Sequence, residues 1–126
     1  MNISKIVISS IIILLLDFIY LGSHSQYFKK VFTKIQGKSI IRYSAALLCY
    51  IAMIALLNTF IIQKYSKPSF KVLSNAFLLG FLTYIIYELT NYATIEKWPL
   101  YLVVVDSIWG GSLFALTSYL TMKFSS

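Results

Sequence analysis

Residues 72–94 read VLSNAFLLGFLTYIIYELTNYAT, an apolar stretch in which Glu88 is the only charged residue. At 1.5 Å per residue, a helix of this length crosses the hydrocarbon core of a bilayer, which is about 30 Å thick. Inside lipid all backbone N–H and C=O groups must bond within the protein, so only helices or closed barrels span a membrane. Barrel strands alternate over about ten residues. The stretch is too long and too continuous for such a strand, and it predicts a membrane-spanning helix.

Three more segments of the same kind surround this stretch, at about 5–22, 43–62 and 98–122. The composition agrees, because 59% of the residues are hydrophobic and only 12% are charged. Soluble domains carry about 25% charged residues. A mean hydropathy of +0.78 excludes a disordered tail and an ordinary soluble enzyme. We therefore expect an all-α, integral membrane four-helix bundle, formed by residues 1–126 as a single membrane domain with helices at about 5–22, 43–62, 72–94 and 98–122.

The first connection, 23–42, predicts a short amphipathic helix. Phe28, Val31, Phe32 and Ile35 recur at helical spacing, and the lysines of this segment fall largely on the other side. Such a helix either lies in the membrane interface or caps the bundle, and the sequence leaves both interpretations open.

The charge pattern indicates lipid partners. The chain carries 11 Lys and Arg against 4 Asp and Glu, and the lysines lie in short segments between apolar runs. This pattern is typical of loops that meet anionic lipid headgroups, and it does not predict a nucleic-acid-binding face. Because five basic residues fall on one side of the predicted bundle and six on the other, the positive-inside rule gives no orientation. Either other signals fix the orientation, or two copies insert oppositely and pair as a homo-oligomer.

Three of the four acidic residues lie inside predicted membrane helices: Asp17, Glu88 and Asp106. An ionised side chain near the bilayer centre costs about 2.5–3.5 kcal/mol on the insertion scale, so these acids must face the bundle interior, pair or hold a proton. With alternating helix directions, all three fall roughly 8 to 12 Å below the same membrane face. They are therefore expected to meet, and adjacent carboxyls cannot all ionise.

Polar and aromatic residues accompany the acids at helical spacing. The third helix carries a stripe of Tyr84, Tyr87 and Asn91 around its acid. The first and last helices repeat one short pattern, a carboxyl followed three residues later by an aromatic residue, with Tyr20 and Trp109 as the aromatic members. We expect these five residues to line the acid cluster.

The cluster suggests two functions of different classes. Asp17, Glu88 and Asp106 form an ion- or proton-binding site if the protein is a small proton- or cation-coupled transporter or channel. Alternatively the protein is a non-catalytic membrane scaffold or assembly protein, in which the same acids only fix helix packing. The sequence carries no nucleophile or phosphate-loop motif and no Glu-x-x-His pair, so neither an enzyme, a metal site nor a cofactor is expected. A membrane enzyme acting on a lipid is the weaker third interpretation.

Several motifs resemble a family of small predicted membrane proteins, domain-of-unknown-function family 2177. They are YELTNYAT at 87–94, WPL at 98–100, DSIWG at 106–110, DFIYLG at 17–22, YF at 27–28 and the AALL-x-Y pattern at 45–50. Glu88 stands where that pattern has Asp and Tyr20 where it has Trp, and both departures keep the type of side chain. The resemblance covers most of the chain. It implies four membrane helices and no particular activity.

Overall fold

The computed structural model describes residues 2–38 and 40–125, and four spans in that part of the chain are long and apolar enough to cross a bilayer. The prediction of an all-α bundle of four membrane helices is confirmed. In chain order the elements are α1 (Ile3–Ser23), α2 (Ser25–Gln36), α3 (Tyr43–Leu57), the π-helical turn η1 (Asn58–Ile62), α4 (Phe70–Thr94) and α5 (Leu100–Ser125). The second span consists of α3 and η1 together.

Local hydrogen bonds explain where several helices begin and end. Asn2 caps α1, since its side chain accepts from the Lys5 N–H at 3.2 Å, and Ser69 caps α4 in the same way. The last helix begins at Leu100, slightly later than expected from the sequence, because Pro99 lies just before the first turn. Gly37 ends α2 with a φ of 81°, a left-handed conformation that glycine adopts without steric cost.

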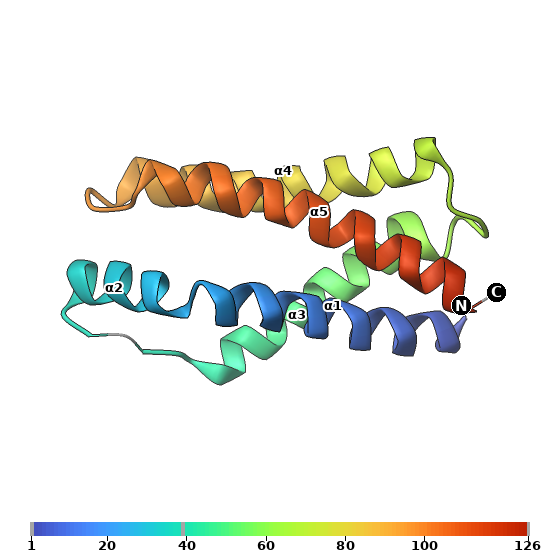
Figure 1. The fold of residues 1–126 in the computed structure, drawn as a ribbon, viewed down its shortest axis with the longest axis horizontal. Coiled ribbons are helices and arrows are strands. Elements are labelled where there is room, and N and C mark those ends of the chain that lie inside the picture. Colours follow the sequence, from blue (N-terminus) through green and yellow to red (C-terminus); the bar gives the residue numbers. More distant parts are fainter. Residues whose placement is uncertain (1, 39, 126) are drawn as a thin grey trace.

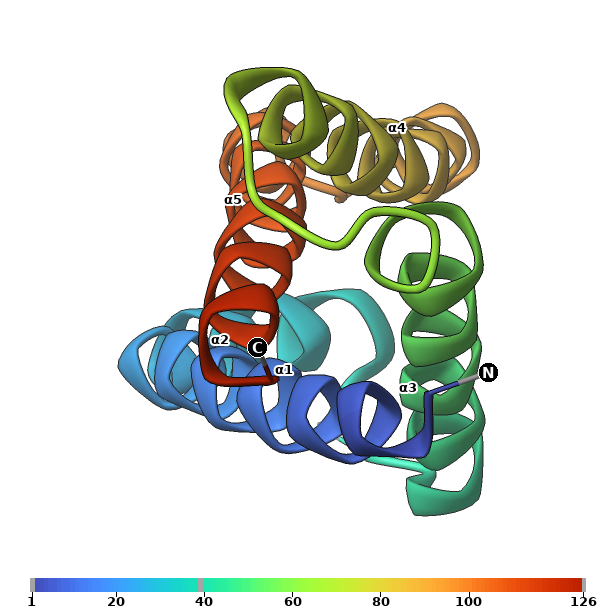
Figure 2. The same cartoon turned by 90° about the vertical axis from the view of Figure 1, so that its right-hand side faces the viewer.

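The four spans run alternately up and down, so the start of α1 and the end of α5 lie at the same end of the molecule (Figure 1). Figure 2 looks along the long axis and shows α4 and α5 side by side, α1 next to α5, and α3 beside α1. The α4–α5 pair has the most extensive contact, whereas α3 touches the bundle mainly through its C-terminal end and η1. Buried Ile13, Leu57, Ile62, Leu113 and Phe114 form the centre of the core.

Glycines bring α4 and α5 together. A Cβ atom on Gly80 would lie 2.2 Å from the carbonyl oxygen of Gly110, and one on Gly110 would lie 2.3 Å from the Tyr84 ring. Only glycine permits this approach of the two backbones, as is common where membrane helices cross. The crossing lies within about two turns of Glu88 and one turn of Asp106, so it sets how close these two acids come.

The amphipathic helix α2 packs against protein. Its Val31 is buried with Trp98, Leu102 and Val103, and the predicted apolar positions Phe28, Phe32 and Ile35 pack on the same cluster. Lys30 and Lys34 are exposed away from this cluster, and Lys29 is also exposed. Figure 1 shows α2 beyond the end of α1, below the turn that joins α4 and α5. Of the two interpretations of this segment, the structure agrees with the helix that caps the bundle.

Candidate functional site

The three intramembrane acids come from three different helices and line one pocket. Asp17 lies on α1, Glu88 on α4 and Asp106 on α5. The pocket has a volume of about 500 Å³, and Tyr20, Tyr84 and Tyr87 also line it. The alternating helix directions therefore bring the three acids to the wall of the same pocket.

Asp17 is 6% exposed and is held by donors from two other helices. The Tyr50 hydroxyl of α3 donates to its Oδ2, and the Trp109 Nε1–H of α5 donates to its Oδ1 at 2.9 Å. Both carboxylate oxygens are thus bonded, which lowers the cost of placing this acid in the membrane interior.

Asp106 accepts a hydrogen bond from the Tyr20 hydroxyl of α1 at its Oδ1. The Tyr20 ring stacks on Trp109, with ring centroids 4.7 Å apart and planes 5° from parallel. His24 follows on the same side of α1, where its ring lies 4.5 Å from that of Tyr20 and its Nδ1 lies 3.0 Å from the Tyr20 carbonyl oxygen. Asp106 is therefore held at the contact between α1 and α5.

Glu88 is completely buried, yet only one of its oxygens has a donor. The Trp98 Nε1–H donates to Oε1 at 3.3 Å, whereas Oε2 has no hydrogen-bond partner. The carboxyl of Glu88 interacts with that of Asp106 on α5. A buried acceptor without a donor is costly, so a proton or another donor placed between Glu88 and Asp106 would stabilise the pair.

The positive charges near the acids are few. Among the residues that line the pocket, Lys29 of α2 is the basic one, and its side chain is exposed. At the end of α1, His24 lies against the ring of Tyr20, the residue that donates to Asp106. Next to α5, burial raises the pKa of Tyr27 above its ordinary value, with smaller contributions from Tyr101 and Asp106. Tyr27 therefore stays neutral around pH 7.

The acids do not converge on a single point. Within residues 2–38 and 40–125, no group of three His, Cys, Asp or Glu side chains is arranged to hold a metal ion. Instead Asp17 is bonded to Tyr50 and Trp109, while Glu88 and Asp106 lie against each other. Asp17 thus has donors on both carboxylate oxygens, whereas in the Glu88–Asp106 pair the Oε2 atom of Glu88 can still accept a hydrogen bond.

The expected lining residues take different places. Tyr20, Tyr84 and Tyr87 line the pocket, and Tyr84 also directs its hydroxyl at the sulfur of Met53, 4.0 Å away. Trp109 contacts Asp17 and Tyr20 as described above. Asn91 is half-buried and does not line this pocket; its backbone oxygen accepts from Ile95 at the end of α4.

Two donors to the acids have no assigned role in the sequence-based prediction. Tyr50 lies in an apolar run on α3, and Trp98 has the position of an interfacial aromatic residue next to a proline. Each side chain combines a large apolar ring with one polar hydrogen. A tyrosine or tryptophan at the same depth in the membrane as an acid is the sequence feature that could have predicted Tyr50 and Trp98 as donors.

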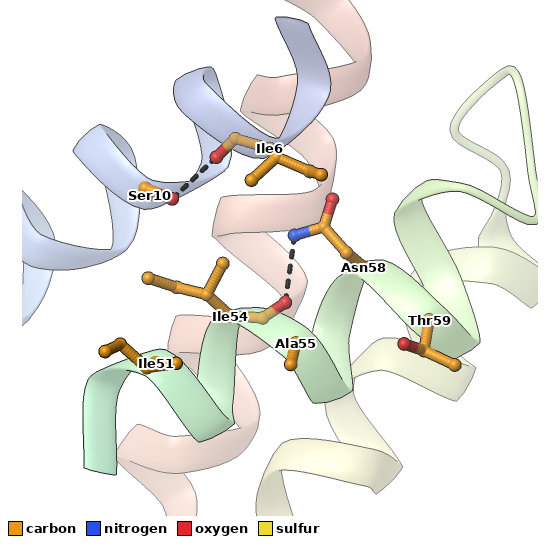
Figure 3. A pocket seen from close by; sticks show the side chains of 7 residues that line it. All are labelled: Ile6, Ser10, Ile51, Ile54, Ala55, Asn58 and Thr59. Atoms are coloured by element: carbon orange, nitrogen blue, oxygen red, sulfur yellow. Dashed lines mark hydrogen bonds between the residues drawn. The ribbon is translucent and has the colours of Figure 1, made fainter. Parts of the chain in front are cut away.

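A second pocket, of about 370 Å³, lies between α1 and α3 (Figure 3). Apolar side chains form most of its wall, and two of its polar members, Asn58 and Ser10, are hydrogen-bonded. Asn58 donates to the Ile54 carbonyl oxygen at 2.9 Å and to Ser9 at 3.0 Å, and Ser10 donates to the Ile6 carbonyl oxygen at 2.6 Å. This pocket thus offers little polar chemistry, in contrast to the pocket lined by the acids.

Comparison with known proteins agrees with the geometry. The model of the family described as "Predicted membrane protein (DUF2177)" matches residues 2–123. No curated protein and no solved structure gives a significant match to the chain. The matched region includes the first three spans, all but the last two residues of the fourth, and all three acids, so the chain belongs to the DUF2177 family of membrane proteins.

Proposed function

We propose that the protein is a small proton- or cation-coupled transporter or channel, in which the Glu88–Asp106 pair is the binding site. The observation that carries this proposal is the Glu88 carboxyl, which is fully buried, lines a pocket and has one oxygen without a donor. Acids kept inside membrane helices are costly, and they commonly mark the path of a proton or an ion. Asp106 supplies the second carboxyl of the pair.

The surroundings of the pair support reversible binding. Tyr20 and Trp98 hold one oxygen of each acid in place, so the two carboxyls have fixed positions while Glu88 Oε2 stays available. A site that transports a proton or cation must keep the positions of its carboxyls after the bound ion is released. Donors that remain in place through loading and release provide that geometry.

Asp17 favours the second candidate function, a membrane scaffold. Both of its oxygens are bonded, to Tyr50 of α3 and Trp109 of α5, so it links three helices. Buried polar groups of this kind can fix how helices pack. We assign this packing role to Asp17 in either function, and the two functions differ in what Glu88 and Asp106 do.

The surfaces at both ends would meet lipid headgroups. Lys29, Lys30 and Lys34 of α2 are exposed at one end, and Lys64, Lys67 and Lys71 are exposed at the other. We infer that anionic headgroups pair with both sets, each lysine contributing about 1 kcal/mol at the membrane surface.

Reconstitution tests the transport proposal directly. Purified protein is placed in liposomes that contain a pH-sensitive dye, and a pH gradient is imposed across the bilayer. The wild-type protein is expected to dissipate the gradient, and Glu88→Gln and Asp106→Asn to reduce the rate toward that of protein-free liposomes. The matched control is Glu96→Gln, which removes the one acid that lies exposed in the turn after α4.

The result distinguishes the two functions. Flux that disappears in both pair variants, with helical content and elution volume unchanged, supports transport. Wild-type liposomes that hold the gradient as well as empty ones, together with a loss of thermal stability in the variants, would instead support the scaffold.

A further inference from the structure

The pocket that the acids line is much larger than a proton or a single metal ion requires. Its volume is about 500 Å³, and its wall combines Glu88 and Asp106 with the aromatic rings of Tyr20, Tyr84 and Phe28. Apolar and aromatic walls with a few polar groups are typical of sites for small organic molecules. Aromatic faces also attract cations, because the ring face carries partial negative charge.

We propose that this pocket binds an organic ammonium ion, with its charged nitrogen at the Glu88–Asp106 pair and its apolar body against Tyr20, Tyr84 and Phe28. The proposal rests on the transport function above, since it names the class of cation that the pair takes. An ammonium N–H would supply the donor that Glu88 Oε2 lacks. The metal alternative is less favoured, because the described acids do not converge as metal ligands.

Protons and ammonium ions would compete for the pair. When Glu88 and Asp106 share one proton, the pair carries a single negative charge. An ammonium ion that binds at the position of this proton displaces it to water, so one positive charge leaves as one arrives. The pocket then keeps the same net charge in both states, which avoids the cost of adding a charge in the membrane.

Charged and titratable groups face the pair from each neighbouring element. They are Asp17 and Tyr20 from α1, His24 from the junction of α1 and α2, Tyr27 and Lys29 from α2, and Tyr84 and Tyr87 from α4, while Tyr50 of α3 bonds Asp17. Lys29 is the basic member of the pocket wall. An ammonium ligand that also carries a phosphate, as a phosphatidylethanolamine headgroup does, would pair with Lys29, whereas a free amine would not.

The two tryptophans of the chain provide a direct readout. Trp98 donates to Glu88 and Trp109 donates to Asp17, so both fluorophores lie at the acids. The purified protein in detergent is titrated with benzylammonium and, in parallel, with the neutral isostere benzyl alcohol. We expect a saturable fluorescence change with benzylammonium that benzyl alcohol does not reproduce. An equal response to both compounds would overturn the proposal.

Variants locate the binding site. Glu88→Gln and Asp106→Asn are expected to weaken benzylammonium binding by about tenfold or more, since each removes a charge-assisted contact. Glu96→Gln, on the exposed turn, should bind as the wild type does. Unchanged affinity in both pair variants would contradict the assigned site.

Proton release tests the same idea without any substitution. In weakly buffered solution, benzylammonium binding to the wild-type protein should release protons, and its affinity should fall as the pH is lowered. Binding without proton release would overturn the competition. If the liposomes dissipate a pH gradient but benzylammonium does not bind, the inference fails while the transport proposal stands; if benzylammonium binds but no flux occurs, the transport proposal fails.

Lipid composition distinguishes the two sources of the ammonium group. The titration is repeated in nanodiscs with and without phosphatidylethanolamine. A headgroup ligand predicts that this lipid competes with benzylammonium and that Lys29→Gln removes the competition. A free amine predicts the same benzylammonium affinity in both nanodiscs.

Discussion

Tyr20 and Trp109 stack face to face across α1 and α5, and each donates its polar hydrogen to the acid on the other's helix. The Tyr20 hydroxyl bonds Asp106, and Trp109 Nε1–H bonds Asp17 at 2.9 Å. The two helices run in opposite directions, so the repeated pattern of a carboxyl followed by an aromatic residue three positions later meets itself head to tail. The short echo in the sequence thus corresponds to a reciprocal pair of contacts.

Replacing Tyr20 separates the two components of this contact. Tyr20→Phe removes the donor to Asp106 but keeps the ring, and it should lower the free energy of unfolding by about 1–2 kcal/mol. Tyr20→Ala also removes the stack on Trp109 and should cost about 1 kcal/mol more. Unfolding in mixed micelles, followed by circular dichroism, measures both. Tyr92→Phe, an exposed tyrosine on α4, is the control, and equal losses in the two Tyr20 variants would show that stacking contributes nothing.

Tyr50 is expected to hold α3 to the bundle. Tyr50→Phe leaves Asp17 Oδ2 without its donor, so it should destabilise the protein by about 1–2 kcal/mol and speed hydrogen exchange in α3. Tyr43→Phe is a matched control on the same helix, because that side chain is 77% exposed. Similar exchange rates in the two variants would exclude a role for Tyr50 in holding α3.

The crossing of α4 and α5 should not tolerate a side chain at Gly80. Gly80→Ala places a methyl group against the Gly110 backbone, 2.2 Å from its oxygen, and should cost about 1–3 kcal/mol. Gly22→Ala meets nothing within 4 Å and should instead stabilise α1 by about 0.5–1 kcal/mol. Thermal unfolding of both variants checks the opposite signs, and a neutral Gly80→Ala would mean that the helices have room to separate.

The ends of the bundle should be accessible from opposite sides of the membrane. Helix α2, which carries Lys30, and the connection between η1 and α4, which carries Lys67, lie at opposite ends of the long axis (Figure 1). In a Cys49→Ala background, which removes the single natural cysteine, Lys30→Cys and Lys67→Cys are labelled in intact vesicles with a membrane-impermeant maleimide. One of the two should react before the vesicles are opened. Equal labelling of both would show insertion in both directions.

The sequence predicts the four spans and that three of them bring their acids to one pocket, because both depend only on hydrophobic length and position along a helix. It places Tyr20 and Trp109 near the acids but does not predict the donors Tyr50 and Trp98, because these depend on how each helix is rotated and where helices cross. Trp98 illustrates this limit: it bonds Glu88 from an irregular turn, where helical periodicity gives no information. Gly80 is a second example. A single glycine inside an apolar run does not predict a helix crossing, and its role becomes clear only because the Gly110 backbone lies opposite.

The order of synthesis gives the Asp17 bonds a further consequence. During synthesis α1 reaches the membrane before the other three spans. Tyr50 follows Asp17 by 33 residues in the sequence, and Trp109 follows it by 92. Until then the first helix carries an acid whose insertion costs about 2.5–3.5 kcal/mol without either donor. Glu88 and Asp106 belong to adjacent helices joined by a short turn, so their pairing needs only the last hairpin. Asp17 therefore gains its second donor only when α5 has entered the membrane.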